Sequence, residues 1–426
     1  MSHKCGSVAV LLGLSITAAL YGEKKPDFSR FVVAGDSLSA GYQNSQLIES
    51  GQVHGYANVI ATQADVSLHL PLLHFPGYPQ ISIDQNYAVV TGLSQTPFDA
   101  LRNKPQTLDF AVPGFTVGAL VGLPPFCNPD PLNPIAVMAA EILNPKCSTN
   151  PPTELEKAAA LKPTTAILWI GSNDALFSIL FGGPPTPLED SATPGFRTLY
   201  HAAASKMASV SGHLVVANIP DVTRTAYLTS VPKLAAILGQ SVLGVETVLG
   251  LQQDDMVTPY AFQAILAMGK SFTYLPDSAP PAPGASPVPI VIRKDTLSDI
   301  RDAVIAYNAV IAHEAADNRA TLVDIYSLIN DLAAHGAWVD GQKLTTGFMG
   351  GLFSLDGVHP TNTGYAIIAN EFIKTMNSFL RTNIPLADVV KVSQHDPLIF
   401  PPIVQGASTG HVDVGMADAL RHLHRQ

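Results

Sequence analysis

Charged side chains are scarce in this chain: Asp, Glu, Lys and Arg make up 14% of its 426 residues, and the formal net charge is -10. Proteins that hold nucleic acid or an anionic membrane surface by electrostatics carry clustered basic residues and a positive balance. We therefore expect no nucleic-acid partner. A neutral or apolar partner, such as a small-molecule or lipid ester substrate, fits this composition better.

Cysteine is also rare, with three residues in the chain. Cys5 lies in the N-terminal segment, which leaves Cys127 and Cys147 as an even pair in a Pro-rich stretch over residues 120–152. Two cysteines without closely spaced His or Cys partners do not make a zinc site, so we expect no metal. A disulfide typical of exported proteins would staple this stretch, and two free buried thiols are the alternative.

Long uninterrupted apolar runs are missing from the two most hydrophobic segments. Residues 8–20 follow Lys4 and have the length of a signal-peptide core rather than of a membrane span. We therefore expect a signal peptide over residues 1–22 and a secreted or periplasmic protein, with an uncleaved anchor or a core helix as the alternatives. Residues 226–275 are apolar too, but Gly and charged residues such as Lys233 interrupt them.

What the chain does contain is a series of short β-branched and aromatic runs that end at glycine or polar residues. The first covers residues 31–34 and leads into Gly-Asp-Ser-Leu at residues 35–38. A sharp strand-to-helix turn at Gly35 would place the Ser37 hydroxyl at the carboxyl end of a sheet, where open α/β folds have their sites. Ser37 is thus a candidate nucleophile, which still needs a base and an oxyanion hole.

The order of strands and helices predicts the fold class. Further apolar runs predict strands at residues 108–112, 166–170, 213–219 and 321–325. Helical spacing of apolar residues, or a capping pattern, predicts helices at residues 40–50, 56–60, 197–210, 296–311 and 363–380. This alternation predicts a mostly parallel five-stranded sheet covered on both faces, in a flavodoxin-like three-layer α/β/α order.

A base and its orienting acid are available near the C-terminal end of this pattern. Asp356 and His359 lie three positions apart in a turn before a helix, and Pro360 would stiffen that turn. Such a spacing could place both side chains on one side of the turn and present the imidazole to Ser37. A structural hydrogen bond between Asp356 and His359 is the alternative.

Donors for an oxyanion are available at the same sheet edge. Asn173 follows the strand at residues 166–170, and its amide can donate a hydrogen bond. Gly114 follows the segment at residues 108–112 and can offer a backbone N–H with no side chain in the way. Taken alone, each feature is weak, because the Asn173 motif could equally be a helix cap.

Together and in this order, these motifs resemble the GDSL lipases and esterases, also called SGNH hydrolases. The matching blocks are residues 35–38, 111–116, 171–174 and 356–360. The resemblance implies a three-layer α/β/α fold with Ser37 as nucleophile, His359 as base and Asp356 as its orienter. It also implies an oxyanion hole made by the backbone N–H groups of Ser37 and Gly114 and by the side chain of Asn173.

The chain departs from the family pattern in two ways. The second block often opens with Asn, where this chain has Asp109. The chain is also long for the family, so we expect a hydrolase domain over residues 23–380 with insertions at 120–152 and 226–290, and a tail over residues 381–426. Residues 406–410 (Gly-Ala-Ser-Thr-Gly) fit the serine motif of α/β-hydrolases, but that fold needs an acid and then a histidine on later strands, and only a short tail follows Ser408.

The expected activity is hydrolysis of a carboxylic ester through an acyl-enzyme, without a metal or an organic cofactor. Low charge and the apolar 226–275 segment favour an acyl lipid. We expect that segment to form a cap beside Ser37 that touches a lipid surface transiently; the alternative is that its leucines and valines only pack on the body of the domain. The alternatives are deacetylation of a carbohydrate, acyl transfer to another alcohol, and an inactive secreted binding protein. Nothing in the sequence indicates an obligate protein partner.

Overall fold

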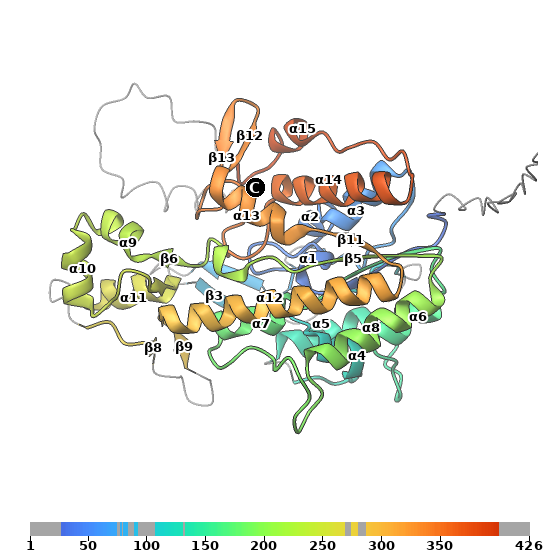
Figure 1. Cartoon of the computed structure of the whole chain (residues 1–426), viewed down its shortest axis with the longest axis horizontal. Helices are drawn as coiled ribbons and strands as arrows, with labels where there is room; N and C mark the ends of the chain where they lie inside the picture. Colours follow the sequence, from blue (N-terminus) through green and yellow to red (C-terminus); the bar gives the residue numbers. More distant parts are fainter. Residues whose placement is uncertain are drawn as a thin grey trace, which may run out of the picture.

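The structure is a computed structural model of the chain (Figure 1). It describes residues 27–74, 77–78, 80–83, 89–92, 107–130, 133–268, 274–279 and 287–399. The expected signal peptide at residues 1–22 and the serine motif at residues 406–410 lie outside these residues.

A four-stranded parallel sheet forms the centre of the molecule, in the order β1-β4-β5-β11. Its strands are β1 (Phe31–Gly35), β4 (Thr165–Trp169), β5 (His213–Ala217) and β11 (Thr321–Val323). All residues of β1 and β4 are buried. Burial on both faces explains why these strands are continuous apolar runs instead of alternating ones.

The fifth expected strand, at residues 108–112, lies beside β1 but forms only one isolated parallel bridge, between Val33 and Asp109. Three backbone hydrogen bonds of 2.9 to 3.2 Å join this segment to β1. The backbone N–H groups of Asp109 and Ala111 are not bonded to β1. The Asp109 N–H donates to Thr107 Oγ1, and the Ala111 N–H donates to Asp109 Oδ1. The expected five-strand order is therefore kept in space, while four strands form regular ladders.

Helices cover both faces of the sheet (Figure 1). Successive strand residues point to opposite faces, so Val32 and Ala34 enter one core while Phe31 and Val33 enter the other. The first core is closed by α4 (Val117–Gly122), α5 (Pro134–Leu143), α6 (Glu154–Ala160), α7 (Ser172–Leu180), α8 (Phe196–Val210) and α12 (Lys294–Asp317). The second is closed by α3 (Tyr56–Gln63), α13 (Ile325–His335) and α14 (Asn362–Phe379). The three-layer α/β/α fold expected from the sequence is thus confirmed.

Several short elements lie outside the central sheet and these helices. They are α1 (Ser37–Ala40), α2 (Glu49–Gln52), β2 (Gln80–Ile83), β3 (Val89–Gly92), η2 (Val222–Arg224), β8 (Ser278–Ala279), β9 (Val288–Pro289), β12 (Ala337–Val339), β13 (Gln342–Leu344) and α15 (Val389–Ser393).

The prediction of a helix over residues 40–50 is wrong. Helix α1 ends at Ala40, Gly41 follows with φ 73°, and α2 does not begin until Glu49. Asn44 and Ser45 between them also have left-handed backbones, with φ 52° and 58°. Contacts with a distant turn hold these residues out of the helical conformation, as shown below. Helix α12 also begins at Lys294, two residues before the predicted capping pattern.

The Pro-rich insertion at residues 120–152 contains a helix that the sequence did not indicate. Helix α5 contributes Met138, Ile142 and Leu143 to the core of the domain. Cys127 and Cys147 form a disulfide with a Cα–Cα distance of 4.8 Å. The insertion is therefore held by a disulfide and by burial against the body, not by a disulfide alone.

The described residues of the segment 226–292, which are 226–268, 274–279 and 287–292, form a cap at one end of the body (Figure 1). The cap contains α9 (Val231–Leu238), α10 (Val242–Leu249), α11 (Pro259–Met268) and an antiparallel sheet of β6 (Thr229–Ser230), β7 (Met256–Val257) and β10 (Val291–Ile292). Leu234 and Leu249 are buried in a separate core that the cap forms by itself. None of the helices in the described part of the chain has the length and apolarity that a membrane span requires.

The first part of the expected tail packs on the domain. Helix α15 contacts α14, and the buried Asp396 accepts hydrogen bonds from the backbone N–H and hydroxyl of Thr363 at 2.7 and 2.8 Å. Leu398 is buried as well. The boundary expected at residue 380 therefore falls inside the packed domain.

Candidate active site

The turn between β1 and α1 presents Ser37. Asp36 caps α1 by accepting a hydrogen bond from the Leu38 backbone N–H at 3.0 Å, and Ser37 is the first residue of the helix. A Cβ at Gly35 would lie 2.3 Å from the Trp169 carbonyl oxygen, so only glycine allows β1 and β4 to approach this closely. The Ser37 side chain is consequently held at the carboxyl edge of the sheet.

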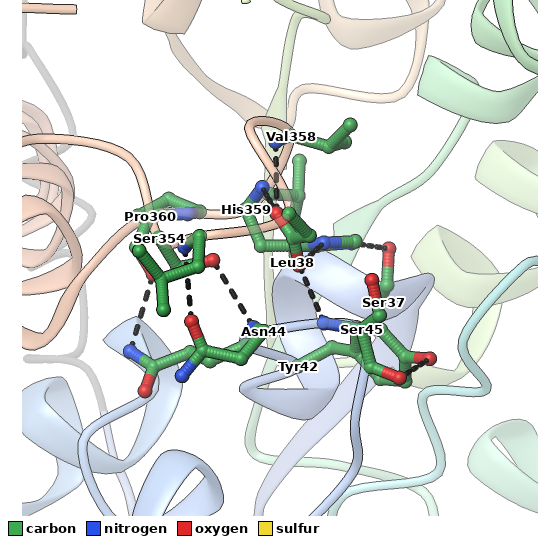
Figure 2. Close-up of polar contacts among 12 residues, drawn as sticks. Ser37, Leu38, Tyr42, Asn44, Ser45, Ser354, Val358, His359 and Pro360 are labelled. Carbon is green, nitrogen blue, oxygen red and sulfur yellow. Dashed lines mark hydrogen bonds and ion pairs between the residues drawn. The ribbon is translucent and has the colours of Figure 1, made fainter. Parts of the chain in front are cut away.

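His359 faces Ser37 across the site (Figure 2). His359 Nε2 lies 2.8 Å from Ser37 Oγ, and His359 Nδ1 lies 2.9 Å from Asp356 Oδ2. The other carboxylate oxygen, Asp356 Oδ1, accepts the backbone N–H groups of Val358 and His359 at 2.8 Å each. The structure thus brings together the serine, histidine and aspartate selected from the sequence, in a hydrogen-bonded chain.

The charge state of Asp356 follows from this arrangement. Burial alone would raise the pKa of Asp356, but the charge of His359 and hydrogen bonds from His359 and Ser45 outweigh burial and lower the pKa to about 2. Asp356 is therefore a carboxylate at neutral pH. A carboxylate on Nδ1 selects the tautomer that leaves Nε2 free to take a proton from Ser37.

The three candidate oxyanion donors lie on neighbouring segments. The Asn173 amide donates one N–H to the Phe115 carbonyl at 2.8 Å. Because Phe115 follows Gly114 in the chain, this bond holds the Asn173 side chain next to Gly114 and leaves the second amide N–H available. Gly114 has φ 83°, and a Cβ there would lie 2.6 Å from the Ile135 side chain. Within the described part of the chain, the backbone N–H groups of Ser37 and Gly114 donate to no acceptor. Two backbone donors and one side-chain donor are thus available at this edge.

Four carboxyl groups are buried behind the Ser37 turn, and the sequence did not reveal this cluster. Glu154 Oε1 accepts a hydrogen bond from the Gly35 backbone N–H at 2.6 Å. Burial raises the pKa of Asp36 to about 7, of Asp109 to about 8 and of Asp174 to about 6, and it raises the pKa of Glu154 well above its usual value. One oxygen of each carboxyl has no hydrogen-bond partner among the described residues.

The cluster was missed because its members are far apart in sequence. Glu154 stands beside the Thr153–Glu156 capping box, a pattern that indicates the exposed first turn of a helix. The one residue in the sequence that could have indicated the cluster is Asp109, which occupies a position where the family often has Asn. A buried acid in place of an amide is a reason to look for protonated carboxyl groups nearby.

A further residue contacts the imidazole. The rings of Tyr42 and His359 lie 4.8 Å apart between centroids, at 57° to each other. The Tyr42 hydroxyl donates to the Ser45 carbonyl at 2.6 Å, and the backbone carbonyl of Tyr42 accepts from the Tyr365 hydroxyl at 2.9 Å. The segment after α1, expected to be helical, therefore forms one wall of the site.

Solved structures that match this chain share little sequence with it. An acetylxylan esterase from Geobacillus stearothermophilus is 13% identical, with 83% of this chain and 96% of that chain covered and a TM-score of 0.34. An extracellular lipase from Streptomyces rimosus is 12% identical, with 82% and 98% covered and a TM-score of 0.31. An α/β hydrolase enzyme from the metagenome of Lake Arreo is 11% identical, with 82% and 95% covered and a TM-score of 0.33.

Comparison with curated proteins yields no match. The model of one family, the GDSL-like lipase/acylhydrolases, matches residues 31–372. This range runs from the first residue of β1 into α14, and it contains all four blocks on which the resemblance was based. The chain therefore belongs to the GDSL-like lipase/acylhydrolase family.

Proposed function

We propose that this protein is a secreted serine ester hydrolase that cleaves carboxylic esters of acyl chains, with Ser37 as nucleophile, His359 as base and Asp356 as the orienting acid. The observation that carries the proposal is the pair of hydrogen bonds made by His359, to Ser37 at 2.8 Å and to Asp356 at 2.9 Å. A nucleophile, a base and an orienter within hydrogen-bond distance of each other are the minimum set for covalent acyl transfer.

The reaction proceeds in two halves. Ser37 Oγ attacks the ester carbonyl carbon while its proton passes to His359 Nε2, and the negative charge on the carbonyl oxygen is stabilised by Ser37, Gly114 and Asn173. Collapse of the tetrahedral intermediate breaks the bond to the alcohol, which leaves with the proton from His359. Water then attacks the acyl-Ser37 ester with His359 again as base, and the acid is released.

The cap supports an apolar acyl substrate. Its helices α9, α10 and α11 contain only Lys233 and Glu246 as charged residues. Leu243 and Leu266 are 71% and 81% exposed, so the cap presents large aliphatic side chains to solvent. A surface of this kind favours transient contact with neutral lipid, since the net charge of -10 disfavours an anionic surface.

The test is hydrolysis of p-nitrophenyl esters of graded chain length by the purified protein. We expect activity on acyl esters, and Ser37→Ala should lower kcat by several powers of ten without changing the melting temperature. Ser39→Ala is the matched control. It also removes a hydroxyl from α1, but this hydroxyl is hydrogen-bonded to Tyr56 and not to His359. A Ser37→Ala variant that retains more than about a tenth of the activity contradicts the proposal.

The same assay separates the substrate classes. Activity that falls steeply beyond acetate, together with release of acetate from acetylated xylan, would favour carbohydrate deacetylation. Wild-type protein that hydrolyses no ester would favour the two alternatives that do not require hydrolysis, which are acyl transfer to another alcohol and an inactive secreted binding protein.

A further inference from the structure

The segment that follows α1 contains two consecutive non-glycine residues in the left-handed region. Asn44 has φ 52° and Ser45 has φ 58°. Asn adopts this conformation more readily than most residues, whereas Ser adopts it rarely. Such backbones persist where surrounding contacts determine them, and they concentrate at functional sites.

The contacts that hold this turn come from the segment that carries Asp356. The Asn44 backbone N–H donates to Ser354 Oγ at 3.1 Å, and the Leu355 backbone N–H donates to Asn44 Oδ1 at 2.9 Å. The Ser45 backbone N–H donates to Asp356 Oδ2 at 2.8 Å. Figure 2 shows Asn44 and Ser45 next to the turn that carries Ser354 and His359. Two adjacent residues thus bond three consecutive residues that are about 310 positions away.

The bond from Ser45 differs in kind from the other bonds to Asp356. The N–H groups of Val358 and His359, which bind Oδ1, belong to the same turn as Asp356 and move with it. Ser45 belongs to the segment that continues from Ser37, because the Tyr42 N–H bonds the Ser37 carbonyl at 3.0 Å. Its bond therefore joins the half of the site that holds the nucleophile to the half that holds the acid and base.

We propose that Asn44 is a positioning residue for the Ser37, His359 and Asp356 arrangement. Its side chain and backbone bind Leu355 and Ser354, which keeps the left-handed turn in place and aims the Ser45 N–H at the Asp356 carboxylate that orients His359. This inference rests on the proposed function, since it assigns Asn44 a part in the same reaction. Asn44 touches none of the three reacting groups directly, so its effect passes through Asp356.

A positioning role predicts a kinetic signature that a purely structural role lacks. Misplacing a catalytic group by about 1 Å costs about 10²-fold in rate, because the reacting atoms no longer meet in line. Asn44→Ala removes the acceptor for the Leu355 N–H, and we expect kcat on p-nitrophenyl acetate to fall about 10- to 100-fold with KM unchanged within about twofold. Asn44→Asp keeps an oxygen acceptor and tolerates the left-handed backbone, so it should restore most of kcat.

A matched control separates backbone strain from positioning. Arg319, two residues after the end of α12, is exposed and also has a left-handed backbone, with φ 53°. Arg319→Ala therefore introduces alanine into the same conformation away from Ser354 and Asp356. We expect a lower melting temperature and an unchanged kcat for this variant.

The experiment measures kcat, KM and melting temperature for the wild type, Ser37→Ala, the two Asn44 variants and Arg319→Ala. If Asn44→Ala fails to fold, Ser354→Ala takes its place, because it removes the acceptor of the Asn44 N–H and should lower kcat in the same way. A folded variant with wild-type kcat, or an Asn44→Asp variant as slow as Asn44→Ala, overturns the positioning role while the hydrolase proposal stands. A wild type no faster than Ser37→Ala overturns both.

Discussion

The backbone N–H of Tyr227, at the start of the cap, donates to the carbonyl of Gly357 at 2.8 Å. Gly357 lies between Asp356 and His359, so the cap is fastened to the turn that carries the acid and the base. A cap beside the Ser37 site was expected from the position of the insertion in the sequence. The hydrogen bond between Tyr227 and Gly357 shows where the cap is attached to the turn.

Gly357→Ala should disrupt this attachment. Gly357 has φ 72°, and a Cβ there would lie 2.6 Å from the Tyr227 nitrogen, so alanine brings both backbone strain and a clash. We expect kcat/KM to fall more than tenfold and stability to fall by about 2–3 kcal/mol. Gly341→Ala is the control: its φ is 74°, but no atom of the described residues lies within 4 Å of the new Cβ. Equal losses in the two variants would show that strain alone accounts for the effect.

Asn173→Ala should lower kcat by about 10²–10³ with little change in KM, because an oxyanion donor acts mainly in the transition state. The variant also loses the bond to the Phe115 carbonyl, so stability must be measured beside rate. Asn370→Ala serves as the control, since Asn370 is equally a buried amide but bonds the Ala387 backbone instead. An effect confined to KM would assign Asn173 to substrate binding.

Asp109→Asn should change how stability depends on pH. Burial raises the pKa of Asp109 from 3.8 to about 8, so between these values the folded protein holds a proton that the unfolded chain has lost. Stability contributed by the protonated acid is therefore complete below about pH 4 and falls as pH rises to about 8. Asparagine has no proton to lose, so the variant does not lose stability in this way. The difference in melting temperature, variant minus wild type, should therefore rise steadily from pH 5 to pH 8.

Thermal melts across that range check the sign of this effect. Asp254→Asn, at an exposed position in the cap, controls for the change in formal charge. The other carboxyl groups of this cluster, Asp36, Asp174 and Glu154, are present in both proteins, so their effects largely cancel in the difference. Parallel curves for wild type and Asp109→Asn would mean that Asp109 is ionised in the folded state.

Replacement of exposed cap residues tests the role of the cap with lipid. Leu243→Ser together with Leu266→Ser should leave the fold intact and lower kcat/KM on emulsified long-chain esters about tenfold or more, because each buried CH₂ contributes about 0.8 kcal/mol. Hydrolysis of soluble p-nitrophenyl acetate should not change. Gln263→Ser, at an exposed position on α11, is the control.

A second pair of cap variants distinguishes surface from core. Leu234 and Leu249 are buried in the core of the cap, so serine at both positions should lower the melting temperature instead of changing chain-length preference selectively. If the Leu243 and Leu266 variants keep the chain-length profile of wild type, the exposed residues do not contact lipid.

The sequence by itself determined the local parts of this protein. Apolar runs such as residues 31–34 and 166–169 lie in strands because their side chains are buried on both faces of the sheet. Gly35 and the short spacing of Asp356 and His359 are also local signals, since a turn and an interaction between residues three apart depend on the immediate backbone. These signals were enough to select the strand order and the residues of the candidate site.

Only the tertiary structure decided how distant segments meet. Asn44 and Ser45 leave the predicted helix because groups about 310 residues away compete for their backbone N–H groups. The acids Asp36 and Glu154 look ordinary in sequence, and their pKa values rise because packing removes water from both. Propensity and periodicity act over a few residues, whereas burial and hydrogen-bond competition depend on every segment that the fold brings together.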